Sequence, residues 1–307
     1  HADLQRQLLA ILKALGPDIL IATHSTELIT EADPDELLVI NKKFQSGKRI
    51  RNPSQLQQVF QVLGSNLNPI LTQLAKTRRA IFVEGKDFQV LSRFARKLDY
   101  SYVANRSDFA VIPVEGFNPT KVRDFIQGIE ITLGVKILAG SIFDRDYRSP
   151  QECKKELSIL SKYCAFVHIH ERKELENFLL VPEPLRRAIE HRMSEQTKRA
   201  GVDLSFEEDV RELLAHLTES MRLRIEARYL AKRRPFEKSR STGLDDSTID
   251  ERLMGEFDED WRDHDRRCLL IPGKEVLAEL NGHIQNKYGI TISPTLIISC
   301  FLKAEVP

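Results

Sequence analysis

The chain has 307 residues, of which 41% are hydrophobic and 30% charged, and its formal net charge is +1. This composition supports a packed core and excludes a polycation that would attract nucleic acid over its whole surface, so any such contact requires a local basic patch or a metal ion. No apolar run approaches the roughly 20 residues that a transmembrane helix needs, so we expect no membrane association and a cytoplasmic location.

The cysteines form no CxxC pair and have no spacing with histidine that indicates a zinc site. They are Cys153, Cys164, Cys268 and Cys300. We interpret all of them as reduced and buried, as is usual in a reducing compartment.

The amino-terminal part mixes helical and strand-like patterns. Leucines recur at helical spacing over residues 2–15, which predicts an amphipathic helix. Residues 18–23 and 37–40 are predicted to form short strands. Residues 53–77 are predicted to form two amphipathic helices separated by Gly64.

Strands and helices then alternate in a way that is typical of a mostly parallel sheet with right-handed crossovers. The predicted strands are residues 80–84, 109–114, 135–144 and 164–170, and the predicted helices are residues 87–98, 119–132 and 150–162. The sequence therefore predicts an α/β fold with helices flanking the sheet.

Residues 182–267 contain no strand-like run, and we predict an all-helical insertion there. Its charge is segregated, because residues 221–240 carry eight Lys or Arg against two Glu, whereas residues 245–265 carry ten acids against two Arg. A strand is then predicted at 268–271, followed by a helix that starts near Lys274, so we expect the sheet to resume.

Two of the apolar runs end abruptly in carboxylates. The first ends in Glu84, and the second is followed by Asp144 and Asp146. In an open α/β sheet, ligands bind at the carboxyl ends of the strands. Side chains two residues apart on an extended segment point the same way, so Asp144 and Asp146 are expected to bind one cation or to bridge two. Mg²⁺ is the natural partner of such hard oxygen donors.

Further polar residues are candidates for the same site, each with a structural alternative. Asp87 is either a metal ligand or a helix-capping residue. Glu174 and Glu176 complete a second metal site or begin a charged helix. Lys274 is a phosphate-contacting cation or an ordinary helix-start Lys, and Ser141 orients water or phosphate or belongs to the core. Two cations roughly 4 Å apart need four or five carboxylates, and the chain offers that many.

The basic run within the insertion is a candidate nucleic-acid contact. The residues concerned are Arg222, Arg224, Arg228, Lys232, Arg233 and Arg234. The alternative is a solvated helix face that pairs with the acidic run after it.

A strand ending in Glu84-Gly85-x-Asp87, followed by a strand ending in Asp144-x-Asp146, resembles the Toprim domain. This domain is shared by topoisomerases, bacterial primases, recombination proteins and OLD-family (overcoming lysogenisation defect) nucleases. The resemblance divides the chain into four parts: 1–77, the tail of an ABC-type ATPase with linker helices; 78–181, the Toprim core; 182–267, the helical insertion; and 268–307, the return to the Toprim sheet.

Three further segments are similar to OLD-family proteins in particular. They are Glu174 to Leu180, Pro272-Gly273-Lys274, and Ile21 to Glu27, the last of which resembles the switch-histidine strand of ABC-type ATPases. OLD proteins join such an ATPase to a Toprim domain. We therefore expect the C-terminal region of a bacterial or archaeal ATPase–nuclease, whose upstream ATPase half is a partner and forms dimers.

The resemblance implies cleavage of DNA with Mg²⁺ or Mn²⁺. It implies that the metal ligands are Glu84, Asp87, Asp144 and Asp146, with Glu174 or Glu176 completing the second site. Lys274 would stabilise the transition state. A phosphate-binding G-x-x-x-x-G-K-[ST] loop is absent, since Ser46-Gly47-Lys48 lacks the upstream glycine, so we expect this chain to bind no ATP alone.

Two other functions stay open at this stage. A topoisomerase-like strand transferase would need a tyrosine nucleophile, and none of the six tyrosines has a recognisable helix-turn-helix context. A non-catalytic module that binds metal or DNA and regulates an ATPase is the second alternative.

Overall fold

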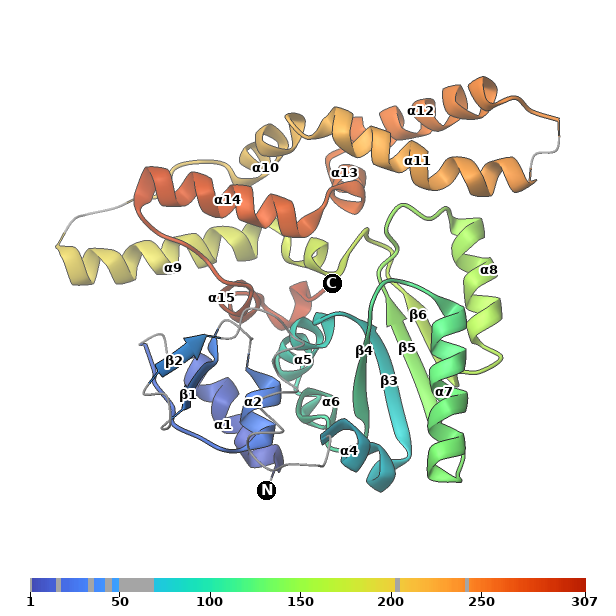
Figure 1. Ribbon diagram of the computed structural model, residues 1–307. Coiled ribbons are helices and arrows are strands. Elements are labelled where there is room, and N and C mark those ends of the chain that lie inside the picture. Colours follow the sequence, from blue (N-terminus) through green and yellow to red (C-terminus); the bar gives the residue numbers. More distant parts are fainter. Residues whose placement is uncertain are drawn as a thin grey trace.

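A four-stranded parallel sheet and a layer of helices across one end of it make up most of the molecule (Figure 1). The computed structural model describes residues 2–14, 18–32, 36–41, 46–49, 69–201, 205–240 and 243–307. Among these residues no helix is long and apolar enough to cross a membrane.

The sheet consists of apolar strands that follow one another through helical crossovers. Its strands are β3 (Arg79–Glu84), β4 (Ala110–Val114), β5 (Leu138–Phe143) and β6 (Phe166–Ile169). They are parallel in the order β4-β3-β5-β6, and Phe82 on the central strand β3 is in register with Ile112 on β4 and Ser141 on β5. The predicted α/β class with a parallel sheet is confirmed.

Three helices cover one face of this sheet. They are α4 (Pro69–Thr77), α7 (Pro119–Leu133) and α8 (Pro150–Leu160). Their apolar stripes, including Leu74, Val122 and Leu160, pack with Phe82 and Phe143 into one buried cluster. Burial of this kind stabilises the fold by roughly 1.5–3 kcal/mol for each large apolar side chain.

The helix after β3 links the sheet to the helical layer. This helix, α5 (Asp87–Lys97), is followed by the short α6 (Ser101–Asn105), which the sequence did not predict. Val90 and Phe94 of α5 belong to the core of the helical layer and not to the core beneath α7. The amino end of α5 is therefore held between the sheet and that layer.

The helical layer lies beyond the carboxyl ends of the strands (Figure 1). It contains α9 (Pro182–Ala200), α10 (Val210–Glu219), α11 (Arg222–Arg240), α12 (Asp246–Arg262), α13 (His264–Leu270), α14 (Gly273–Tyr288) and α15 (Pro294–Ser299). Ile189, Tyr229, Phe257, Leu280 and Phe301 share one buried core, so residues 182–267 and 268–307 pack as a single unit.

The expected return to the sheet after residue 267 is wrong. Cys268 and Leu270 lie in the last turn of α13, whose start is capped by the Asp263 side chain accepting from the Arg266 backbone N–H at 2.9 Å. The chain then continues as helices α14 and α15 and the short 3-10 turn η3 (Lys303–Glu305). A short buried apolar run is compatible with a helix end as well as with a strand. In this protein the run packs against other helices, and this packing favours the helical conformation.

The amino-terminal part contains α1 (Ala2–Ala14), α2 (Thr26–Glu31), β1 (Leu38–Asn41) and β2 (Ser46–Arg49). The strand predicted at 37–40 is confirmed as β1, which pairs with β2 in a separate antiparallel sheet. The strand predicted at 18–23 is wrong, because this stretch has no regular structure and Leu20 within it is 96% exposed. Gly64 and the helix predicted before it lie outside the described residues.

Candidate functional site

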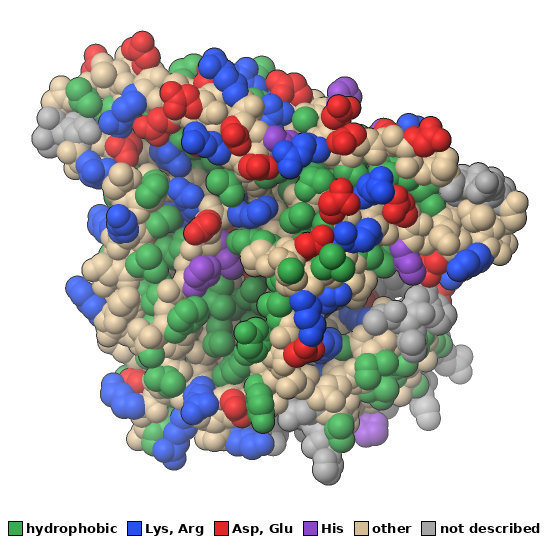
Figure 2. Space-filling model, turned by 180° about the vertical axis from the view of Figure 1, so that it is seen from behind, with side chains coloured by type: hydrophobic (Ala, Val, Ile, Leu, Met, Phe, Trp, Pro, Cys, Tyr) green, Lys and Arg blue, Asp and Glu red, His purple; other side chains and the backbone are tan. Residues whose placement is uncertain are grey.

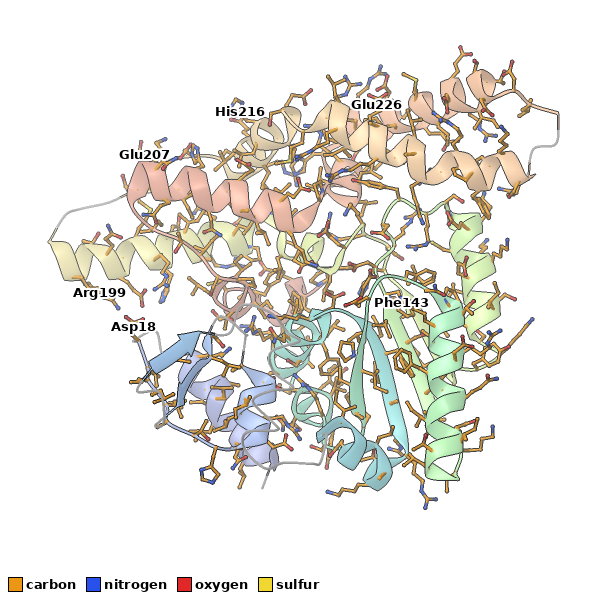
Figure 3. All side chains as sticks on the ribbon, in the orientation of Figure 1. Asp18, Phe143, Arg199, Glu207, His216 and Glu226 are labelled. Atoms are coloured by element: carbon orange, nitrogen blue, oxygen red, sulfur yellow. The ribbon has the colours of Figure 1, made fainter. Side chains whose placement is uncertain are left out.

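The site lies where β3 and β5 end beneath the helical layer. Figure 3 marks this end of β5 by Phe143, the last residue of the strand. Glu84 is the last residue of β3, and Gly85 adopts a left-handed φ of 51° that turns the chain into α5. This conformation favours glycine because a Cβ would be strained there. Asp87 then begins α5 with a buried side chain.

Asp144 follows β5 directly and is fixed by the backbone of another segment. Its Oδ1 accepts a hydrogen bond of 2.9 Å from the Leu175 N–H, and its side chain is buried. Its backbone N–H lies close enough to the Glu84 carboxylate to oppose the rise in the pKa of that residue. Asp144 therefore stands between the end of β3 and the segment that follows β6.

The predicted relation between Asp144 and Asp146 is wrong in its geometry. The strand ends at Phe143, and Asp146 has a left-handed φ of 52°, so the two side chains are not successive members of one strand face. The Asp146 N–H donates to the Lys173 carbonyl at 2.7 Å, and its Oδ2 pairs with Arg148 at 3.0 Å. Asp146 nevertheless lies near Glu84, because its charge contributes to raising the pKa of that residue.

A short 3-10 turn, η2 (Leu175–Leu179), carries the next two acids. Glu174 precedes this turn and pairs with Lys173 at 2.5 Å, and Glu176 lies inside it. Asn177 ties the turn to the helical layer, because its Nδ2 donates to the carbonyls of Cys268 at 2.8 Å and Ile271 at 2.7 Å.

Lys274 reaches the cluster because α14 begins in contact with η2. A Cβ on Gly273 would lie 2.6 Å from the Asn177 backbone N, so only glycine permits this approach. The Lys274 N–H donates to Glu174 Oε2 at 3.4 Å, and its Nζ lies 3.5 Å from Glu176 Oε1. The side chain is 59% exposed and lines a cavity of about 600 Å³ together with Asp87 and Glu176.

Burial and mutual repulsion raise the pKa of several of these carboxyls. Desolvation, reinforced by neighbouring carboxylates, raises the pKa of Asp87 to about 7 and that of Asp144 to about 8. Desolvation also raises the pKa of Glu84 and of Glu176. Perturbed acids in a cleft are typical of functional sites.

Lys274 responds in the opposite sense. Burial alone would lower the pKa of Lys274, but the carboxylates around it, led by Glu176 and Asp87, outweigh that effect and raise the pKa. Lys274 is therefore held as a cation in contact with the acids.

The cluster carries more negative than positive charge. Its acids are Glu84, Asp87, Asp144, Asp146, Glu174 and Glu176, and its bases are Arg148, Lys173 and Lys274. Two buried carboxylate oxygens, Glu84 Oε2 and Glu176 Oε2, accept no hydrogen bond. An unpaired buried charge is costly, so this arrangement favours binding of a cation.

The donor set fits a hard divalent cation in its chemistry, since it consists of carboxylate oxygens. As the side chains stand, no group of three or more His, Cys, Asp or Glu among the described residues is arranged to hold a metal ion. The residues whose side chains would turn toward a bound ion are Glu84, Asp87, Asp144, Asp146 and Glu176.

Ser141 lies apart from the carboxylates. Its side chain is fully buried in mid-strand near the Cys164 thiol, and its hydroxyl has no hydrogen-bond partner among the described residues. This position favours the alternative in which Ser141 belongs to the core. All four cysteines are free, with Cys164 and Cys268 buried and the other two half-buried.

Sequence reasoning missed the residues that support the acids. Arg148, Lys173 and Asn177 neutralise or position Asp146, Glu174 and η2. The Asn177 side chain accepts a hydrogen bond of 3.3 Å from the Glu174 N–H, as in a capping box. The residue types are reversed from the usual Ser/Thr-x-x-Glu/Gln pattern, so the sequence gives no signal for it. Gly273 carries no such signal, since its role depends on a contact with a distant segment.

The basic run on α11 is largely engaged in ion pairs. Arg222 pairs with Asp258, Arg224 and Arg228 with Glu275, Arg233 with Glu256, and Arg234 with Asp250. Arg233 is buried and also donates to the Tyr147 carbonyl at 2.9 Å. Lys232 is half-buried and has no ion pair within the described part of the chain. Figure 2 shows acidic and basic side chains interspersed over the helical layer.

In comparisons with known proteins, no family model, no curated protein and no solved structure matches this chain. Its function must therefore be argued from the carboxylate cluster itself.

Proposed function

We propose that this chain is a divalent-metal-dependent DNA endonuclease that nicks and cleaves by hydrolysis of a phosphodiester. The observation that carries the proposal is the collection of six carboxylates and one exposed lysine at the ends of β3 and β5. Enzymes that cleave or form phosphodiesters commonly use Mg²⁺ or Mn²⁺ held by carboxylates.

The fold is compatible with a Toprim domain and with the OLD family. Glu84 ends the central strand β3, and Asp144 follows its neighbour β5 in the parallel sheet. This is the relation that the Toprim resemblance implies. The proposal includes an upstream ATPase half as the partner that would bind ATP and form dimers.

A bound divalent cation would polarise the phosphate and lower the pKa of a water molecule at neutral pH. Glu84, Asp87, Asp144 and Asp146 would hold it, and Glu176 would assist on the side of Lys274. The chain's own contribution is to fix these groups. The Leu175 N–H holds the Asp144 carboxylate in place, and the bonds from Asn177 hold η2 beneath α14.

Lys274 is the group best placed to bind a substrate phosphate. It is the one basic residue of the cluster whose side chain is mostly exposed, whereas Arg148 is buried and Lys173 half-buried beside their acids. Its contact with Glu176 at 3.5 Å is loose enough to be exchanged for a phosphate oxygen.

Cleavage of supercoiled plasmid tests the proposal. The wild type should nick or linearise the plasmid with Mg²⁺ or Mn²⁺ and not with EDTA. Asp144→Asn keeps an acceptor for the Leu175 N–H but removes the charge, and we expect a loss on the order of 100-fold or more, since a cation contributes several kcal/mol to such a reaction. The exposed acid Asp124, on α7, supplies the control Asp124→Asn. Equal cleavage by both variants would contradict the proposal.

A non-catalytic metal- or DNA-binding module is the second candidate, and one observation favours it. The carboxylates do not converge as a group of three around one point. This candidate predicts DNA binding without strand scission at any metal concentration.

A topoisomerase-like reaction has less support. Tyr147 is the tyrosine next to the cluster, but it is buried against Tyr229, and desolvation raises the pKa of its hydroxyl. A buried, protonated phenol is a poor nucleophile. Recovery of a covalent protein–DNA adduct after denaturation would support a topoisomerase-like reaction.

A further inference from the structure

One face of the parallel sheet is only partly covered. The helices α4, α7 and α8 pack against the face that carries Phe82 and Phe143. Side chains alternate between the two faces along each strand, so the opposite face carries Ile81, Leu138 and Ile142. These three residues belong to neither buried apolar cluster, and Leu138 is exposed. Parallel sheets are usually covered on both faces, so this open face is available to a ligand.

A row of aromatic rings lies along the edge strand β6 on the open face. Phe166 is in register with Gly140, which has no side chain to cover the sheet. Phe166 and His168 are exposed, and their rings are parallel to within 2°, with centroids 6.4 Å apart. The row continues through His170, 5.1 Å from His168, to Phe178 of η2, 5.3 Å from His170. Figure 2 shows hydrophobic side chains lining a hollow below the helical layer, with histidine side chains at its edge.

This aromatic row ends beside the carboxylate cluster. The His170 N–H donates to the Phe143 carbonyl at 3.0 Å, and Asp144 is the next residue after Phe143. Phe178 lies in the same short turn as Glu176. A ligand that extends along the row therefore reaches the strand ends where the carboxylates lie.

The charge of the open face is positive. Arg79 begins β3 on this face, is exposed and forms no ion pair among the described residues. At the other end of the row, the Arg172 guanidinium lies over the Phe178 ring, 5.0 Å from its centroid, and forms no ion pair within the described part of the chain. The residues that β3, β5 and β6 place on this face include no acid. An anionic ligand therefore meets cations and no like charge on these strands.

We propose that the aromatic row binds a single-stranded segment of nucleic acid, with bases stacked on Phe166 and His168 and phosphates near Arg79 and Arg172. This inference rests on the proposed function and deepens it, because it names the form of the substrate that reaches the carboxylates. Exposed rings on an open sheet bind unpaired bases well, since every base has a flat face. The cations without acidic partners favour this ligand over an apolar protein segment.

Phe166 offers the sharpest test, because it is 54% exposed and its replacement should leave the core intact. Phe125, which is 49% exposed on α7, supplies the matched control. We compare Phe166→Ala with Phe125→Ala by fluorescence anisotropy of a labelled oligothymidylate in EDTA, where no cleavage occurs. We expect Phe166→Ala to weaken binding by roughly 10-fold because a stacked base loses its partner, and Phe125→Ala to bind like wild type.

Two further variants separate stacking from simple apolar contact. Phe166→Leu keeps an apolar side chain without an aromatic face, so it should bind as weakly as Phe166→Ala, whereas Phe166→Trp should keep the wild-type affinity. Trp261 is the only native tryptophan and is buried. The tryptophan introduced by Phe166→Trp is therefore a direct reporter, and oligothymidylate should quench its fluorescence. Full affinity of Phe166→Leu would overturn the stacking role.

The cationic part of the proposal is tested through salt. Arg79→Gln should reduce the salt dependence of oligothymidylate binding by about one counterion, because one phosphate contact is lost. Arg262, an exposed arginine in the last turn of α12, supplies the control Arg262→Gln, which should keep the wild-type dependence. Equal salt dependence of both variants would contradict the contact at Arg79.

Equal affinities of Phe166→Ala and Phe125→Ala would overturn the inference, as would a wild type that binds no single strand. A second copy of the chain is the other occupant to distinguish. If Phe166→Ala dissociates a dimer in sedimentation velocity but leaves oligothymidylate affinity unchanged, the face is a self-association surface and the proposal is overturned.

The outcome is independent of cleavage. Asp144→Asn should bind oligothymidylate at least as tightly as wild type while it loses cleavage. A Phe166→Ala binding defect in a protein that cuts nothing would support the aromatic row and refute the nuclease, and cleavage with no such defect would do the reverse.

Discussion

Charged side chains are numerous both on the α11–α12 hairpin and at the ends of β3 and β5. Their charges are neutralised in different ways in the two regions. On the hairpin, Arg222, Arg234 and Lys238 each pair with an aspartate of α12. At the strand ends, burial and repulsion raise the pKa of Asp87 and Asp144 above that of an ordinary carboxyl.

The difference teaches where to look for function in a chain with almost no net charge. In the sequence, the segregated charge runs indicate the hairpin as a candidate contact for nucleic acid. In the structure these charges form ion pairs at the surface, where each pair contributes little to stability. The strand-end carboxylates are fewer and are scattered along the sequence. Asp146, Glu174 and Glu176 each pair with a base, but Glu84, Asp87 and Asp144 form no ion pair among the described residues and so remain uncompensated. Uncompensated charge indicates a ligand more reliably than dense charge.

The largest effect that separates the two regions should come from Lys274. Lys274→Gln removes the exposed cation of the cluster, and we expect metal-dependent plasmid cleavage to fall on the order of 100-fold because the charge that develops on phosphate loses its partner. Lys287 lies on the same helix, is similarly exposed and pairs with Glu208. The control Lys287→Gln should cleave like wild type, and an equal loss in both variants would point to damage of α14 and not to catalysis.

The contact between the helical layer and η2 can be tested through glycine. Gly273→Ala should destabilise the protein by about 1–3 kcal/mol, because its Cβ would overlap the Asn177 backbone. Gly282 lies on the same helix with nothing within 4 Å of an added Cβ, so Gly282→Ala should stabilise by up to about 1 kcal/mol. Denaturant unfolding measures both changes, and two changes of the same sign would refute the close approach.

The strand-end acids should make stability fall as pH rises. Asp87 and Asp144 titrate near 7 and 8 in the folded chain but near about 3.9 when unfolded, so the folded state binds more protons between those values. In EDTA we expect the contribution of these two acids to the melting temperature to be greatest below about pH 4 and to decline toward pH 8, by roughly 2–4 °C for each kcal/mol lost.

Asp144→Asn should flatten this decline, and Asp124→Asn should leave it unchanged. Addition of Mg²⁺ at pH 8 should raise the melting temperature of the wild type more than that of Asp144→Asn, because a bound cation stabilises the ionised form. A melting temperature that rises with pH across this window would contradict the assigned shifts.

The smallest effect is expected on the hairpin. A double-mutant cycle with Arg222→Gln and Asp258→Asn should give a coupling free energy of about 0.2–1 kcal/mol, as for other exposed pairs. The same Arg222→Gln variant should bind oligonucleotide as tightly as wild type and with the same salt dependence. A weaker affinity would indicate that the α11 arginines contact nucleic acid.

Local pattern was sufficient to predict the sheet and its helices. The apolar runs that became β3, β4, β5 and β6 were recognised with ends within a few residues, because each is bounded by turn residues or acids. Residues 18–23 have the same local pattern but no strand to pair with among the described residues, and they remain irregular. Pairing is a property of the whole fold and not of the run itself.

The candidate site was predictable in its residues more than in its geometry. The acids at the strand ends follow from the topology rule that ligands bind there, and Glu84, Asp87 and Asp144 do affect one another. The turn at Asp146, the apolar run that became the end of α13 and the role of Gly273 depend on contacts between distant segments. No window of the sequence contains that information.

The bonds from Asn177 to the carbonyls of Cys268 and Ile271 span 91 and 94 residues of chain. Closing loops of that length carries an entropic cost that must be met before the contacts form. The parallel sheet and its crossovers can assemble from nearer neighbours, so the lysine end of the site should become ordered last, when the helical layer docks. A folding chain would therefore have its strand-end acids in place before the cation that accompanies them, and the site would be complete only once α14 has docked on η2.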